Sequence, residues 1–197
     1  MTIWQSYNFI IIRGVRVLDF MDTINKEIKF SEVTMNRVNE LISHYPEGKQ
    51  KSALLPVLHL AQKEFGGWLS VPTMDYVASI LKLEPIEVYE VATFYTMYNQ
   101  RPVGKCMIEF CQTGPCLLKD TEPLIAYTEK KLGIKTGETT ADGKFTIKAV
   151  ECLGACGYAP MAQIGQFYYQ NLTEEKIDKI IAEFGRPDFD PEKKYEI

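Results

Sequence analysis

One stretch changes the pattern of the whole chain: Lys105-Cys-Met-Ile-Glu-Phe-Cys-Gln-Thr-Gly-Pro-Cys116. Before this stretch the apolar residues recur at helical spacing, whereas from Lys105 to Cys111 they alternate. Alternation predicts a β-strand, in which Cys106 and Cys111 point to opposite faces of a sheet. We therefore expect a second structural unit to begin at about Pro102-Val103-Gly104.

The rest of this second unit mixes helices and strands. Glycine in the first position of Gly165-Gln166 suits a two-residue hairpin turn, and Pro123 marks a point where a helix is expected to restart. The predicted elements are a helix over 117–132, a strand over 144–150, a hairpin over 161–170 and a helix over 173–185. This order predicts an α/β unit in which helices cover a small mixed sheet.

The chain before residue 102 has a different organisation. Apolar residues recur at helical spacing between residues 32 and 92, and the connections are short, which predicts an antiparallel helical bundle. We expect Thr73 to cap the third helix, and Glu84-Pro85 to begin the fourth. The predicted organisation is an N-terminal extension over 1–30, a bundle over 31–101, the α/β domain over 102–185 and an extended or partner-bound tail over 186–197.

Composition excludes several classes of protein. The chain has 197 residues with 22 Lys and Arg against 26 Asp and Glu, a net charge near −4, so it lacks the basic surface of a nucleic-acid-binding protein. Residues 9–20 are apolar, but they contain charges and are shorter than the roughly 20 residues that span a bilayer. We expect neither membrane insertion nor a secretory signal, and therefore reduced thiols.

The cysteines carry the main functional signal. Cys111 and Cys116 form one pair, with four residues between them, and Cys152 and Cys156 form a second, with three residues between them. Zinc sites usually place two residues between paired cysteines, whereas a wider spacing of about four residues is typical of [2Fe–2S] loops. The spacing favours a [2Fe–2S] cluster on these four cysteines and leaves zinc, disulfides or unliganded thiols as alternatives.

The remaining candidates have structural interpretations. Strand alternation places Cys106 beside Ile108 and Phe110, so a buried thiol is expected rather than a ligand. Gly114 and Gly154 lie inside the two cysteine loops, where they either admit backbone N–H groups to sulfur or permit turns. The other candidates are expected to have capping, packing or docking roles: His44, His59 and the aromatic run of Tyr89, Phe94, Tyr95 and Tyr98.

At this point the chain resembles a known family over roughly residues 30–185. The similar motifs are Gly66-Gly67-Trp68-Leu69, residues 88–95, residues 102–105 and the two cysteine loops, the second followed by Ala159-Pro160. They resemble the thioredoxin-like [2Fe–2S] ferredoxins that form the 24-kDa subunit of respiratory complex I. The resemblance implies a helical bundle followed by a thioredoxin-like domain, with cluster ligands at Cys111, Cys116, Cys152 and Cys156.

The resemblance also implies a function. Such a chain is a one-electron relay in the NADH-oxidising module of NADH:quinone oxidoreductase, with no substrate site of its own. It docks on a flavin- and NADH-binding subunit, where FMN and NADH are expected, beside further iron–sulfur subunits. The assembly lies peripherally on the cytoplasmic face of a bacterial inner membrane, or on the matrix side in mitochondria. Equivalent subunits of NAD-linked hydrogenases or formate dehydrogenases, and a zinc-stabilised interaction module, are the alternatives.

Overall fold

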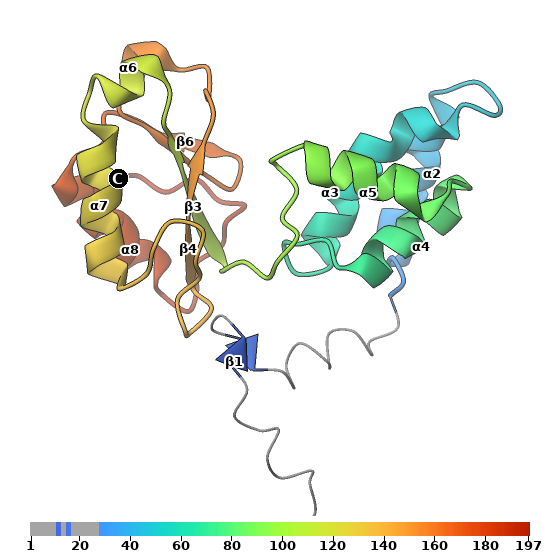
Figure 1. Ribbon diagram of the computed structural model, residues 1–197, viewed down its shortest axis with the longest axis horizontal. Coiled ribbons are helices and arrows are strands. Elements are labelled where there is room, and N and C mark those ends of the chain that lie inside the picture. Colours follow the sequence, from blue (N-terminus) through green and yellow to red (C-terminus); the bar gives the residue numbers. More distant parts are fainter. Residues whose placement is uncertain (1–10, 13–14, 17–27) are drawn as a thin grey trace, which may run out of the picture. The chain divides into compact units, whose positions relative to one another are not determined.

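The computed structural model describes residues 11–12, 15–16 and 28–197 (Figure 1). The chain divides into two compact units between Pro102 and Val103, beside the predicted change of pattern. Most of the extension predicted over 1–30 lies outside the described residues; within it, β1 (Ile11–Ile12) pairs antiparallel with β2 (Val15–Arg16). Among the described residues, no helix combines the length and apolarity needed to cross a membrane.

Unit 1 is the predicted bundle of helices (Figure 1). Its elements are α2 (Glu32–Ser43), η3 (Gln50–Ala53), α3 (Leu54–Glu64), α4 (Val71–Leu81) and α5 (Pro85–Phe94). Each long helix turns its apolar stripe inward, and the shared core includes Val38, Val57, Val77 and Val88. Tyr98 belongs to this core as well and donates a hydrogen bond from its hydroxyl to the Leu55 carbonyl.

One helix start in unit 1 differs from the sequence prediction. Ser70, and not Thr73, is the N-cap of α4, because its side chain accepts a hydrogen bond from the Thr73 N–H. Thr73 lies three residues inside and pairs its hydroxyl with that of Ser70. The expected start of α5 is confirmed, with Glu84 as the N-cap of a capping box and Pro85 in the first turn.

Unit 2 contains the predicted mixed sheet. Its elements are β3 (Cys106–Cys111), α6 (Gly114–Leu117), α7 (Thr121–Leu132), β4 (Phe145–Val150), η4 (Cys156–Tyr158), β5 (Ala162–Ile164), β6 (Phe167–Tyr169) and α8 (Glu174–Phe184). The strand order is β4-β3-β5-β6. β3 runs parallel to β4 and antiparallel to β5, and β5 and β6 form the predicted hairpin around Gly165-Gln166.

The main core of unit 2 lies on one face of this sheet. Cys106, Ile108 and Phe110 are fully buried there together with residues of α7 and α8, which lie side by side in Figure 1. Cys111 points to the other face and belongs to a separate small cluster. The predicted parity of β3 is therefore confirmed, and with it the burial of Cys106.

The helix predicted over 117–132 is broken before the expected point. α6 ends at Leu117 and α7 begins at Thr121, because Asp120 adopts a left-handed conformation with φ +62°. Pro123 lies in the first turn of α7, where its missing N–H removes no intrahelical bond. The break thus precedes the proline and is set by Asp120.

The C-terminal segment does not form the extended tail that we expected. Phe189 is buried and stacks on Phe184 of α8, with ring centroids 4.7 Å apart, while Tyr195 packs against both rings. The Tyr195 N–H donates to the Tyr169 hydroxyl at 3.3 Å. Residues 186–197 therefore complete the core of unit 2, because packing the rings of Phe189 and Tyr195 against Phe184 of α8 removes apolar surface from water.

Phe189→Ala should lower the free energy of unfolding of unit 2 by about 3 kcal/mol, since the change removes a buried ring from a packed cluster. Native-state hydrogen exchange of the slowest β3 amides measures this free energy. Lys194→Ala, an exposed position of the same segment, should change it by less than about 0.5 kcal/mol. Equal effects of the two variants would show that the segment does not stabilise unit 2.

Candidate metal centre

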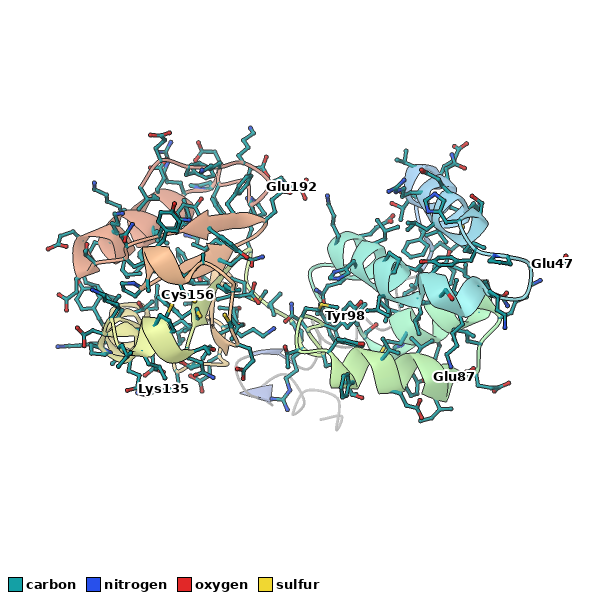
Figure 2. The ribbon with its side chains drawn as sticks, turned by 90° about the horizontal axis from the view of Figure 1, so that it is seen from above. Glu47, Glu87, Tyr98, Lys135, Cys156 and Glu192 are labelled. Carbon is teal, nitrogen blue, oxygen red and sulfur yellow. The ribbon has the colours of Figure 1, made fainter. Side chains whose placement is uncertain are left out.

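Two cysteine loops meet at one edge of the sheet in unit 2. Cys111 is the last residue of β3 and pairs with Val150, the last residue of the parallel strand β4. Because parallel neighbours end at the same edge, the loop after each strand begins at the same place. Cys116 lies in α6 after the first loop, and Cys152 lies in the second. Cys156, which is labelled in Figure 2, follows in the second loop at the start of η4.

The four thiols differ in burial. Cys111 and Cys116 are only 3% and 2% exposed and form a small cluster with Met161, against which Leu153, Ala155 and Ala159 pack. The other two cysteines, Cys152 and Cys156, are exposed. The first loop thus supplies two interior sulfurs, and the second supplies two at the surface.

Backbone N–H groups point at these sulfurs. The Gly154 N–H donates to Cys152 Sγ at 3.4 Å. The backbone N–H groups of Leu153 and Thr113 help to lower the pKa of Cys111, and that of Met161 partly offsets the rise in the pKa of Cys116. An N–H donor favours negatively charged sulfur, the form in which cysteine binds metals, but at Cys116 burial outweighs this effect.

The pKa values of the two interior thiols, Cys111 and Cys116, are shifted in opposite directions. Burial opposes ionisation of Cys111, but the N–H groups of Leu153 and Thr113 and the Cys116 thiol outweigh it and lower the pKa of Cys111. Burial, followed by the hydrogen bond to Cys111, raises the pKa of Cys116 to about 11, and the nearby Cys156 adds to this rise. Cys116 therefore interacts directly with Cys111 and electrostatically with Cys156.

The structure gathers the predicted residues at one edge but does not form a closed ligand set. Within residues 28–197, no three metal-binding side chains lie in range of a single ion. Cys106 lies on the opposite face, and burial raises the pKa of its thiol. His44 is the C-cap residue of α2, and His59 packs on the Tyr98 ring at 5.1 Å, as expected of capping or packing residues.

The glycines of both loops meet a conformational requirement. Gly114 and Gly154 have φ values of +21° and +76°, and an added Cβ would meet no atom within 4 Å at either position. Glycine is therefore required for the turn and not for close packing. The same turn directs the Gly154 N–H at Cys152. Gly154 therefore both permits the turn and brings a backbone N–H to sulfur.

Sequence reasoning missed two residues of the site. Met161 packs with the two buried cysteines, and the Tyr168 hydroxyl donates to the Leu153 carbonyl at 2.7 Å. Alternation in the predicted hairpin could have placed Tyr168 and Tyr169 on opposite faces, but no local signal indicates that Tyr168 reaches the second cysteine loop.

Comparisons with known proteins identify the family. The family model described as thioredoxin-like [2Fe–2S] ferredoxin matches residues 38–185, and the chain belongs to this family. It is 48% identical over 155 residues to an NADH-quinone oxidoreductase subunit of Rickettsia felis, a match that covers 79% of this chain and 93% of that protein. The expected family, the α/β fold class and the [2Fe–2S] cofactor named by the family description are thereby confirmed.

Two further similarities are more distant or partial. The chain is 44% identical over 144 residues to the mitochondrial NADH dehydrogenase [ubiquinone] flavoprotein 2 of Dictyostelium discoideum, a match of 73% of this chain and 58% of that protein. An NAD⁺-reducing [NiFe]-hydrogenase, solved in its air-oxidised state, has a TM-score of 0.58 at 23% identity and matches 67% of this chain and 22% of the hydrogenase chain. This last likeness supports the fold alone.

Gly154→Ala should strain the second cysteine loop by about 1 kcal/mol, because a Cβ disfavours positive φ. Hydrogen exchange across residues 151–158 should therefore become several-fold faster. Gly157→Ala is the matched control: it lies in the same loop and its Cβ also meets no atom within 4 Å, but its φ is not positive. Equal exchange in the two variants would contradict a conformational role for Gly154.

Proposed function

We propose that this chain is the [2Fe–2S] electron-transfer subunit of an NADH:quinone oxidoreductase. Cys111, Cys116, Cys152 and Cys156 are the proposed cluster ligands. The observation that carries the proposal is the convergence of two cysteine loops at the ends of parallel strands, with the Gly154 N–H directed at Cys152 Sγ. Membership of the [2Fe–2S] ferredoxin family supports the same ligand set.

The donor chemistry fits an iron–sulfur cluster. The four proposed ligands are all thiols, and thiolates are the ligands that [2Fe–2S] clusters take. A bound cluster supplies one-electron redox chemistry, and its potential depends on hydrogen bonds to sulfur and on burial. The role of this chain is to hold the sulfurs, direct N–H groups at them and restrict water on the side of Cys111 and Cys116.

The proposed partner is a flavin- and NADH-binding subunit, with which the cluster exchanges single electrons. An exposed apolar rim beside the cysteines supports such docking: Leu117, Leu118 and Tyr158 are large, apolar and solvent-exposed, and each lies one or two residues from a proposed ligand. Further iron–sulfur subunits complete the assembly. The proposed assembly lies peripherally on a bacterial inner membrane or in mitochondria, and the name of the Dictyostelium discoideum relative includes a mitochondrial location.

A subunit of an NAD-linked hydrogenase or formate dehydrogenase is the second candidate. The likeness to an NAD⁺-reducing hydrogenase favours it, but only through the fold, at 23% identity. The relative at 48% identity, which is matched over nearly its whole length, carries the name of an NADH-quinone oxidoreductase subunit. The higher identity favours the first candidate.

Cys152→Ser should abolish or strongly perturb the cluster, because it replaces a proposed thiolate ligand. Cys106→Ser should leave the cluster in place, since Cys106 lies in the core on the other face of the sheet. Visible absorption, electron paramagnetic resonance and assays of iron and acid-labile sulfide on the purified full chain measure both outcomes.

The wild-type chain provides the reference for these two variants. A colourless protein with stoichiometric zinc and no acid-labile sulfide would replace the electron-transfer proposal by the zinc-stabilised module. Loss of the cluster in Cys106→Ser together with its retention in Cys152→Ser would overturn the ligand assignment while leaving the cluster itself in place.

Leu118→Glu should weaken association with the flavin subunit at least tenfold while leaving the visible spectrum unchanged. Leu118 is 85% exposed, so the change should not disturb folding, but it places a charge at the centre of an apolar contact. Affinity measured by surface plasmon resonance between purified subunits tests this. Val33→Glu, a similarly exposed apolar position in unit 1, is the control, and equal affinity of both variants would exclude the rim as the docking surface.

A further inference from the structure

Leu153 packs against the small cluster that holds Cys111 and Cys116. The next N–H along the chain, that of Gly154, donates to Cys152 Sγ at 3.4 Å. The carbonyl of Leu153 accepts a hydrogen bond from the Tyr168 hydroxyl at 2.7 Å. One side chain outside both loops therefore contacts the peptide unit whose N–H faces the proposed ligand Cys152.

Peptide geometry links these contacts. The Leu153 carbonyl and the Gly154 N–H belong to one peptide unit, which is planar, so they point in opposite directions. A hydrogen bond that fixes the carbonyl toward Tyr168 also fixes the N–H toward Cys152. In addition, hydrogen bonds in series polarise one another, so donation by Tyr168 strengthens the donor that faces sulfur.

Tyr168 is itself held firmly. It lies on β6, opposite Gln163 of β5, and its neighbour Tyr169 is buried in the core of unit 2. The chain just after β6 is tied to the second cysteine loop by two backbone bonds, from Asn171 N–H to the Tyr158 carbonyl and from Leu172 N–H to the Pro160 carbonyl. Tyr168 therefore reaches the Leu153 carbonyl from a strand whose position relative to the loop is fixed.

We propose that Tyr168 is a positioning residue that acts through the Leu153–Gly154 peptide to hold the Gly154 N–H against Cys152 Sγ, and thereby raises the reduction potential of the cluster. This inference rests on the proposed function. Tyr168 exchanges neither an electron nor a proton; its hydroxyl remains a donor throughout. The sign follows because reduction adds one negative charge, which N–H groups directed at sulfur stabilise.

Tyr168→Phe removes only the hydroxyl, and the ring is 42% exposed, so packing changes little. The midpoint potential of the cluster in the full chain, titrated by electron paramagnetic resonance, should become more negative. A threefold loss in the equilibrium constant for reduction corresponds to about 28 mV, at about 59 mV per tenfold for one electron. Hydrogen exchange of residues 151–156 in the cluster-free chain should be accelerated by at least threefold.

Tyr45→Phe is the matched control. Tyr45 is an exposed tyrosine of unit 1, and no hydrogen bond of its hydroxyl is found among the described residues. The same chemical change there should alter neither the potential nor the exchange rate. A further variant, Tyr168→His, retains a donor on a ring and should recover part of the shift in potential.

The outcomes separate this inference from the proposed function. A wild-type chain without a [2Fe–2S] spectrum overturns both. With the wild-type cluster present, a potential of Tyr168→Phe equal to that of Tyr45→Phe overturns the positioning role and leaves the proposed function intact. If Tyr168→Phe fails to retain the cluster, the exchange measurement decides: faster exchange over residues 151–156 supports the positioning role, and unchanged exchange overturns it.

Discussion

The parallel pairing of β3 with β4 is the constraint on which the rest of the site depends. The two strands pair in register from Cys106 opposite Phe145 to Cys111 opposite Val150, so their following loops begin at one edge. Parallel strands cannot be joined by a tight turn and need a crossover. The 35 residues between Cys116 and Cys152 supply it, with α7 packed on the sheet. The long interval between the cysteine pairs is thus a consequence of strand direction.

Unequal burial gives the site two sides. Cys111 and Cys116 lie inside a small apolar cluster, where exclusion of water strengthens each N–H···S contact. Cys152 and Cys156 lie at the surface, and Leu118 of the same unit is exposed as well. A partner that covers the apolar rim would remove water from the exposed pair too. Assembly and redox tuning are therefore coupled in the proposed function, because both depend on the same surface.

Features set by neighbouring residues were predictable from sequence, and those set by distant contacts were not. Alternation placed Cys106 and Cys111 on opposite faces, because side-chain direction in a strand depends only on parity. By contrast, the break before α7 depends on the backbone conformation of Asp120, and Phe189 joins the core through distant aromatic partners. The cysteine spacing is likewise local, whereas the bond from Tyr168 joins residues 15 positions apart.

The burial of Cys106 has a consequence for how the proposed cofactor is loaded. A chain with five thiols offers an iron–sulfur donor several wrong combinations of four, but the core of the sheet holds one thiol among Ile108 and the helices and keeps it protonated. Cys111 and Cys116 are buried as well, but they lie in the small cluster against which Leu153 and Ala155 of the second cysteine loop pack, whereas Cys106 lies in the core on the other face of the sheet. Strand parity therefore separates Cys106 from the four proposed ligands in the folded domain.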